Sequence, residues 1–267
     1  MKKMITTCVA VSILLSNNAH AKFDFSKTPE TLSTYYVSPL QELNIVKNKL
    51  LNHGFEILST DEILLGEYII TITNDELKAT NSYMATLHIL VNNITKEIRV
   101  QNPSYLGAAY LQEAYKYGQF KKTLMALEKS LGEINEVEEK LDFSDLASYK
   151  FMFGMPQLED TISLMKVSTL ENRVNSKSIL YSLKLSNGTT LIGHKLTKRT
   201  SKFLKKIGQE NNALLLPYES MIKNGEATTL NPKYYLALSM PLLSMGEFMK
   251  IVTAPDQIIK DLKKSYQ

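Results

Sequence analysis

The chain repeats one pattern of residues at two distant places. Residues 102–122 read NPSYLGAAYLQEAYKYGQFKK, and residues 231–250 read NPKYYLALSMPLLSMGEFMK. Both stretches contain Asn-Pro-x-Tyr, an alanine three residues after the tyrosine, and a later Gly-x-Phe. A second pair of segments, beginning at Lys22 and Lys140, also matches in the same order. The sequence therefore predicts one structural unit of about 120 residues that is present twice.

Hydrophobic periodicity predicts an α+β fold for each unit. In the first unit, residues 39–55 have apolar residues at helical spacing and a glycine near the end. Three segments that alternate apolar and polar residues follow, as half-buried strands do. In the second unit, Asn187-Gly188 and Asn224-Gly225 are typical turns of β-hairpins. We expect two similar two-layer domains, each an antiparallel sheet with helices packed on one face.

The boundaries of the units follow from a leader and from a change in composition. Residues 1–21 combine a basic start, an apolar run of about a dozen residues and Ala19-His20-Ala21, which predicts a cleavable secretory signal and a periplasmic protein. That run is shorter than the roughly 20 residues of a membrane helix, so we expect no membrane-spanning segment after cleavage. The predicted domains are residues 22–132 and 146–267, joined by an acidic linker at residues 133–145 and paired as an intrachain pseudo-dimer.

Charge and cysteine content exclude several classes of function. The one cysteine, Cys8, lies in the predicted signal, so the mature chain is expected to have no disulfide, thiolate metal site or cysteine nucleophile. The chain has 31 basic and 27 acidic side chains, and Lys2 and Lys3 leave with the signal. The remaining balance of about +2 argues against binding of nucleic acid by long-range attraction.

The repeated Asn-Pro motif is predicted to be a junction between a strand and a helix. Asn102 and Asn231 can cap the free N–H groups of the next helix, and proline is favoured at the first helical position. Tyr105 and Tyr234 then lie on one helical face with small residues. The alternative interpretation is an active site in which Tyr105 or Tyr234 acts as an acid or as a hydrogen-bond donor.

The residues 214–240, LLLPYESMIKNGEATTLNPKYYLALSM, resemble the domain of unknown function 302 family. In that family a Leu-Pro-Tyr strand, a glycine hairpin and an Asn-Pro corner occur in this order. The segment IRVQNPSYLGAAYL, residues 98–111, looks like a second, diverged copy, with His88-Ile89 in place of the Pro-Tyr. The resemblance implies two small α+β domains and implies no activity.

No group of residues predicts a catalytic centre. The sequence has no Gly-x-Ser-x-Gly elbow, phosphate-binding glycine loop, His-Glu-x-x-His or dinucleotide fingerprint. The candidate binding residues are polar or aromatic residues of the repeated motif and of the strands near it: Asn102, Tyr105, His194, Tyr218, Asn231 and Tyr234.

A metal site is the alternative chemistry. The segment FMFGMP, residues 151–156, places Met152 and Met155 among aromatic residues, and a thioether is a soft ligand for copper or haem iron. His88 or His194 would have to lie close by to complete such a site. Methionine beside aromatic residues is more often core filling, so we expect no cofactor.

One segment is strongly basic. Residues 194–210, HKLTKRTSKFLKKIGQE, are predicted to form a helix with an apolar side and a lysine-rich outer face. An anionic lipid surface, an acidic partner or a bound anion fits such a face. The alternative is that the lysines are only solvated and bind nothing.

Two classes of function remain. The favoured class is a non-catalytic ligand-binding or protein-interaction module of the periplasm, built from a duplicated domain, whose partner is a small ligand or another periplasmic protein. The other class is a metal- or haem-associated redox accessory protein.

Overall fold

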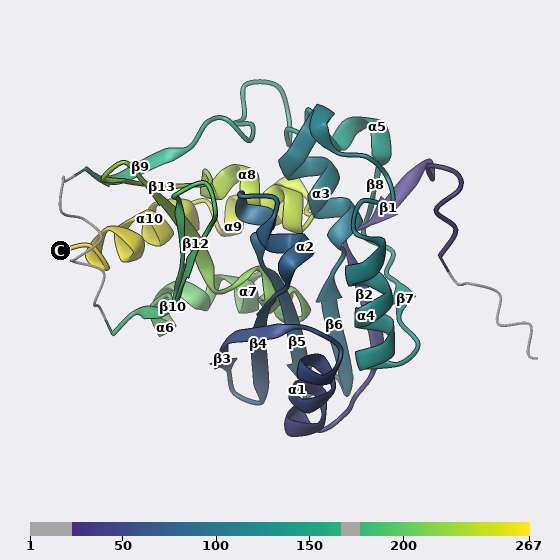
Figure 1. Cartoon of the computed structure of the whole chain (residues 1–267). Coiled ribbons are helices and arrows are strands. Elements are labelled where there is room, and N and C mark those ends of the chain that lie inside the picture. Colours follow the sequence, from purple (N-terminus) through teal and green to yellow (C-terminus); the bar gives the residue numbers. More distant parts are fainter. Residues whose placement is uncertain (1–22, 167–176) are drawn as a thin grey trace, which may run out of the picture.

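The computed structural model describes residues 23–166 and 177–267, which are organised around two large antiparallel sheets and a two-stranded one (Figure 1). We call the elements around the larger sheet, up to residue 146, the first lobe, and those around the other large sheet, from residue 162 on, the second lobe. The fold is α+β, as the hydrophobic periodicity predicted. The predicted signal, residues 1–21, lies outside the described residues.

The first lobe is built around a sheet with the strand order β3-β4-β5-β6-β2-β7. Helices α1 and α4 cover one face of this sheet (Figure 1), and their leucines pack against alternate residues of β4, β5 and β6. The elements of this lobe are β1 (Thr31–Ser33), β2 (Tyr35–Pro39), α1 (Leu43–Asn52), β3 (Glu56–Leu64), β4 (Glu67–Thr73), α2 (Asp75–Lys78), η1 (Tyr83–Ala85), β5 (Leu87–Asn92), β6 (Glu97–Gln101), α3 (Pro103–Leu111), η2 (Gln112–Ala114), α4 (Lys121–Leu131), β7 (Asn135–Glu136), β8 (Lys140–Asp142) and α5 (Phe143–Leu146).

The second lobe is built around a sheet with the strand order β10-β11-β12-β13-β9. Helix α10 packs against this lobe through Ile258 and Leu262, which are buried in its core. The elements of this lobe are β9 (Ile162–Lys166), β10 (Ile179–Lys184), β11 (Thr190–His194), α6 (Lys198–Ser201), α7 (Phe203–Lys206), η4 (Glu210–Leu215), β12 (Tyr218–Lys223), β13 (Glu226–Thr229), α8 (Pro232–Ser239), α9 (Met245–Lys250) and α10 (Ala254–Lys264).

The two sheets share one strand order. If β2, β3, β4, β5 and β6 are matched to β9, β10, β11, β12 and β13, both sheets read in the same sequence, with antiparallel pairing throughout. Each Asn-Pro corner follows the last strand of its series and begins a helix, α3 or α8. This correspondence supports the duplication, which remains a prediction.

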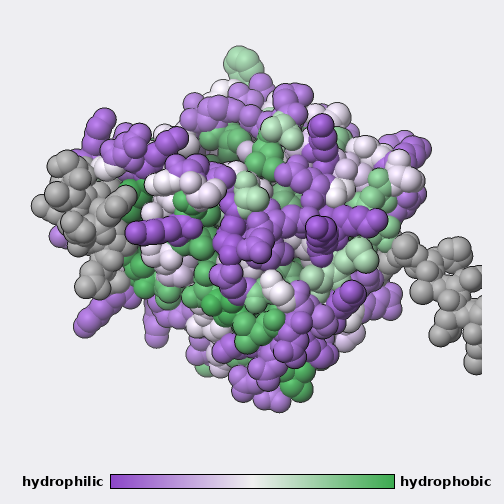
Figure 2. All heavy atoms as spheres, viewed as in Figure 1, coloured by the Kyte–Doolittle hydropathy of each residue, from purple (hydrophilic) through white to green (hydrophobic). Residues whose placement is uncertain are grey.

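The lobes pack on each other through the faces that their helices leave open. In β4 and β5 the side chains of Ile70 and Ile89 face the core under α1 and α4, whereas Ile69 and Leu90 join the core of the second lobe. The period of two along a strand explains this division, because neighbouring residues point to opposite faces. On the face drawn in Figure 2, hydrophobic side chains gather over the second sheet and the β3 end of the first, among polar ones.

Several local predictions are confirmed. Gly54 has a φ of +86°, as expected for the residue that ends a helix. Turns at Asn187-Gly188 and Asn224-Gly225 join β10 to β11 and β12 to β13. The Asn-Pro motifs are strand-to-helix junctions.

Residues 133–145, expected to be a linker, are part of the first lobe. β7 adds a strand to the first sheet, and β8 pairs with β1. Glu139 lies 3.4 Å from the guanidinium of the buried Arg99, which also donates a hydrogen bond of 2.8 Å to Asn212 of the second lobe. One acidic residue of this segment therefore pairs with a buried arginine that in turn contacts the second lobe.

Candidate functional site

The two Asn-Pro corners meet at the interface between the lobes. The side chain of Asn102 accepts a hydrogen bond from Ser104 N at 2.9 Å, and that of Asn231 accepts one from Lys233 N at 3.1 Å. Both asparagines therefore cap helices, as the sequence predicts. The second role of Asn102 is to donate a hydrogen bond to Ser33 O at 2.7 Å.

Three tyrosine hydroxyls of the chain before β9 donate to the last carbonyl groups of α8. Tyr149 reaches Ala237 O at 3.1 Å, Tyr105 reaches Leu238 O at 2.7 Å, and Tyr35 reaches Ser239 O at 2.7 Å. The last turn of a helix has carbonyl groups without intrahelical partners, so these bonds satisfy the C-terminus of α8 inside the protein. Tyr105 is thus a structural residue of the interface, and Tyr234 packs in the same core.

The other predicted binding residues also lie inside the second lobe. Tyr218 donates a hydrogen bond to Leu230 O at 3.0 Å and meets the ring of Tyr235 edge to face. The Nε2 atom of His194 lies 2.7 Å from Ser220 Oγ and 3.2 Å from the hydroxyl of Tyr266. Both side chains are buried, so neither faces an open ligand site.

Burial lowers the pKa of His194 to about 3, against 6.5 for a free histidine. The unfolded chain therefore takes up a proton at His194 below pH 6.5 and the folded chain does not, so this residue makes the protein less stable as the pH falls from 6.5 towards 3. We expect a slope of about 1 kcal/mol per pH unit in that window. Urea unfolding of the parent and of His194→Asn measures it: the stability difference between the two should change in favour of the variant as pH falls.

The parent and the variant must be compared because Glu67 changes the stability of the protein with pH in the opposite direction to His194. Burial and, after it, the nearby Glu210 carboxylate raise the pKa of Glu67 to about 7, so its contribution to stability falls as the pH rises above 4.5. A stability difference between His194→Asn and the parent that stays constant from pH 7 to pH 4 would contradict the prediction for His194.

The residues that were considered as metal ligands differ in burial and in the groups that they contact. Met152 is exposed, while Met155 packs against the core of the second lobe. His88 is buried in β5, with Nδ1 at 2.8 Å from Leu214 O and Nε2 at 3.8 Å from the Glu219 carboxylate. Within residues 23–166 and 177–267, no three His, Cys, Asp or Glu side chains are arranged to hold a metal ion.

A polar cluster around Glu219 joins the two sheets. The hydroxyls of Thr86 and Tyr181 both donate to Glu219 Oε1, and the Nε2 atom of His88 faces the same oxygen without a hydrogen bond. Glu219 belongs to β12. His88 belongs to β5, the strand at the matching place in the other sheet, and Thr86 directly precedes β5. This cluster is the main polar contact that the sequence analysis missed.

The space beside Glu219 is too small for a substrate. A narrow cavity lined by Glu219, Leu230 and four tyrosines leaves about 10 Å³ to the centre of a water-sized sphere, which is room for one water molecule. Burial raises the pKa of the lining tyrosines Tyr83, Tyr110, Tyr218 and Tyr235, so their hydroxyls stay protonated at ordinary pH. The geometry fits a buried hydrogen-bond network that locks the lobes together.

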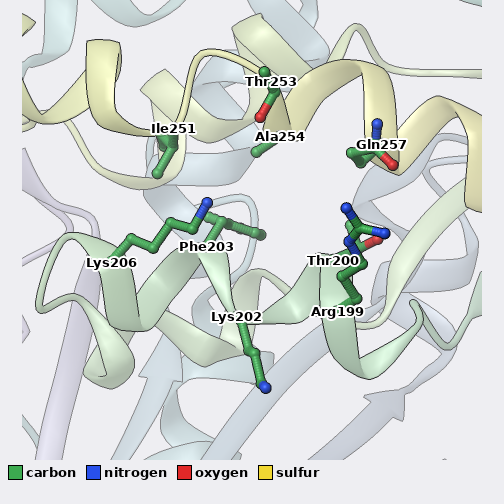
Figure 3. A pocket seen from close by; sticks show the side chains of 9 residues that line it. All are labelled: Arg199, Thr200, Lys202, Phe203, Lys206, Ile251, Thr253, Ala254 and Gln257. Atoms are coloured by element: carbon green, nitrogen blue, oxygen red, sulfur yellow. The ribbon is translucent and has the colours of Figure 1, made fainter.

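An open groove of about 430 Å³ lies on the outside of the second lobe, within the usual size of small-molecule sites (Figure 3). Helices α6 and α7 form one wall, and the segment from the end of α9 into α10 forms the other. The lining residues combine three cations, an apolar floor and polar side chains: Arg199, Thr200, Lys202, Phe203, Lys206, Ile251, Thr253, Ala254 and Gln257.

The cations of the groove differ in direction. In Figure 3 the ammonium end of Lys206 lies beside Phe203, and the guanidinium of Arg199 faces Gln257 across the groove. Lys202 points away and also lines a second hollow of about 230 Å³, with Lys198, Lys205 and the tip of the β3–β4 hairpin. No acidic residue lines the groove, so its electrostatic potential favours an anion.

The basic segment has a different local structure from the predicted single helix. It forms two short helices, α6 and α7, and the buried Ser201 donates a hydrogen bond back to Thr197 O at 3.3 Å. Such back-bonding competes with regular helix geometry. The apolar side is buried as predicted, at Leu196, Phe203, Leu204 and Ile207.

Fold and groove together define an α+β protein with antiparallel sheets and a basic outer groove. No family model, curated protein or solved structure was found to match the chain. Among the described helices, none has the length and apolar character required to cross a membrane.

Proposed function

We propose that this chain is a non-catalytic binding protein whose groove between α6–α7 and α9–α10 takes an anionic ligand with an apolar part. The observation that carries the proposal is the lining of the groove. Arg199 and Lys206 supply positive charge on opposite sides of an apolar floor that includes Phe203 and Ile251, and no carboxylate lines it. Arginine and lysine in this setting favour phosphate or carboxylate groups.

The proposed ligand binds in the outer groove and not between the lobes, because the contact between the lobes is filled. Tyrosine hydroxyls, the Glu219 cluster and a mixed apolar core fill the contact between the lobes. A duplicated unit whose two copies lock together as a pseudo-dimer accounts for this contact. The resemblance to the domain of unknown function 302 family, the cleavable signal and the periplasmic location belong to the same proposal.

The alternative function, a copper or haem accessory protein that uses Met152, Met155 and His88, has weaker support. His88 is engaged with Leu214 and faces Glu219 inside the interface, whereas Met152 is exposed to solvent. Elemental analysis of purified protein separates the two functions. A stoichiometric copper or iron signal that is lost on replacing both methionines would favour the alternative.

Calorimetric titration with octyl phosphate, kept below the concentration at which it forms micelles, tests the proposed groove. We expect Arg199→Glu and Lys206→Glu each to weaken binding about tenfold or more, because a charged hydrogen bond contributes about 1.5 kcal/mol or more and the new carboxylate repels the phosphate. Lys184→Glu, on the exposed outer part of β10, is the matched control and should bind as the parent does. Absence of binding, or equal binding by all four proteins, would refute the proposal.

A further inference from the structure

The groove is the centre of a larger basic face. Helix α10 packs beside α6, and both helices, with α7, direct lysine or arginine side chains to solvent. Asp256 is the exposed acid of α10, and Asp261 is buried, where it accepts hydrogen bonds from Thr197 N and Oγ1 at 2.9 and 2.8 Å. The exposed cations on these helices, or between α6 and α7, are Lys198, Arg199, Lys202, Lys205, Lys206, Lys260, Lys263 and Lys264. One of them, Lys264, lies 3.9 Å from the Asp261 carboxylate.

Apolar side chains project next to this face. Met245 and Met249 are four residues apart, on one side of α9, and Met249 is 58% exposed. Val252, which is 47% exposed, directly follows the groove residue Ile251. The end of α9 therefore carries exposed apolar groups to the rim of a cationic groove.

A turn from elsewhere in the chain adds to these apolar groups. The ring of Phe151 stacks on that of Phe248, the buried aromatic residue of α9, with 5.4 Å between the centroids. This contact holds the turn that follows Phe151 against α9. Phe153, in that turn, is 95% exposed.

We propose that the face formed by α6, α7, α9 and α10 docks on the surface of an anionic lipid bilayer. The basic side chains contact the headgroups, and Met249, Val252 and Phe153 enter the boundary between headgroups and acyl chains. Lysine-rich surfaces with adjoining exposed apolar residues have this mode of attachment, which needs no membrane-spanning helix. The inference rests on the proposed function, because Arg199 and Lys206 of the groove supply part of the charge.

The shape of the apolar groups favours a bilayer over an acidic protein. In protein–protein contacts, protruding apolar anchors fill pockets or grooves of the partner. Here the apolar side chains protrude, and Phe153 is almost fully exposed in a turn. A fluid bilayer accepts protruding side chains without a matching cavity.

Flotation with lipid vesicles tests the docking. The chain from Lys22 onward is mixed with vesicles of phosphatidylcholine that contain a quarter phosphatidylglycerol, or with phosphatidylcholine alone. Removal of residues 1–21 keeps the apolar leader from binding the vesicles itself. We expect at least tenfold more protein to float with the anionic vesicles, and the difference to shrink as salt is raised, because ions screen charge.

Two double variants separate the electrostatic contribution to vesicle binding from the apolar contribution. Lys202→Glu/Lys263→Glu is expected to abolish flotation, and Met249→Ser/Val252→Ser to reduce it at least fivefold in the same vesicles. Leu51→Ser, at an exposed position of α1 in the first lobe, and Lys184→Glu are matched controls that should float as the parent does. All of these residues are exposed, and circular dichroism checks that each variant is folded.

Three outcomes would overturn the docking. They are equal flotation with both kinds of vesicle, no effect of Met249→Ser/Val252→Ser, and binding to soluble polyphosphate or DNA in place of vesicles. If octyl phosphate still binds in the groove under those outcomes, the docking fails while the proposed function stands. If both octyl phosphate and vesicles fail to bind, the proposed function fails as well.

Discussion

Replacing Glu219 by alanine is expected to lower the free energy of unfolding by about 3 kcal/mol. The change removes the one carboxylate oxygen that accepts from Thr86 and Tyr181 and that faces His88. Each of the two buried hydroxyls, of Thr86 and Tyr181, loses its acceptor at a cost of about 1.5 kcal/mol, and both lie at the lobe interface. Urea unfolding followed by far-ultraviolet circular dichroism measures the loss.

Glu219→Gln is the matched control for this prediction. Its amide oxygen has the same position as Oε1 and can accept the hydrogen bonds of Thr86 and Tyr181, but a neutral amide accepts them more weakly than a carboxylate does. We expect this variant to lose about 1 kcal/mol, well below the alanine variant. A Glu219→Ala protein as stable as the parent would show that the cluster does not hold the lobes together.

Gly193→Ala is the second substitution with a large expected effect, about 3 kcal/mol of destabilisation. Gly193 lies in β11 between Tyr181 of β10 and Glu219 of β12, which are its cross-strand neighbours. The tyrosine ring crosses the glycine, and its hydroxyl reaches Glu219 on the far side. A Cβ atom at residue 193 would lie 2.0 Å from Tyr181 Cε1, so the ring must move and lose the hydrogen bond.

A double-mutant cycle identifies the cause of that loss. In a Tyr181→Ala background the ring is absent, and Gly193→Ala should then cost about 0.5 kcal/mol or less. The difference between the two backgrounds is the coupling between residues 181 and 193. If Gly193→Ala costs the same in both, then contact with the tyrosine ring is not the cause of the loss.

Local signals in the sequence predicted much of the fold. The hairpin turns at Asn187-Gly188 and Asn224-Gly225 are both present, and each has its glycine in the left-handed region, with φ of +81° and +75°, which glycine adopts without strain. The Asn-Pro corners depend on a cap and on the fixed φ of proline, which are also local. Strand β3, with the sequence EILSTDEIL, was not predicted, because its alternation of apolar and polar residues is irregular.

The contacts between the lobes could not be predicted from the sequence. Thr86 and Glu219 are 133 residues apart, and neither has neighbours that mark it as a polar contact. Tyr105 was correctly placed on a buried helical face, yet its hydrogen bond to Leu238 depends on the packing of the two corners. The groove was anticipated only as a basic segment, because its second wall comes from residues about 50 positions later in the chain.

Binding at the outer groove, with the lobe interface left closed, is tested most directly by amide chemical-shift mapping during titration with octyl phosphate. We expect the shifts of Arg199, Lys206, Ile251 and Gln257 to move in a saturable way and those of Thr86, His88 and Glu219 to stay constant. Large shifts at Thr86, His88 and Glu219, without shifts in the groove, would contradict this assignment and place the ligand between the lobes.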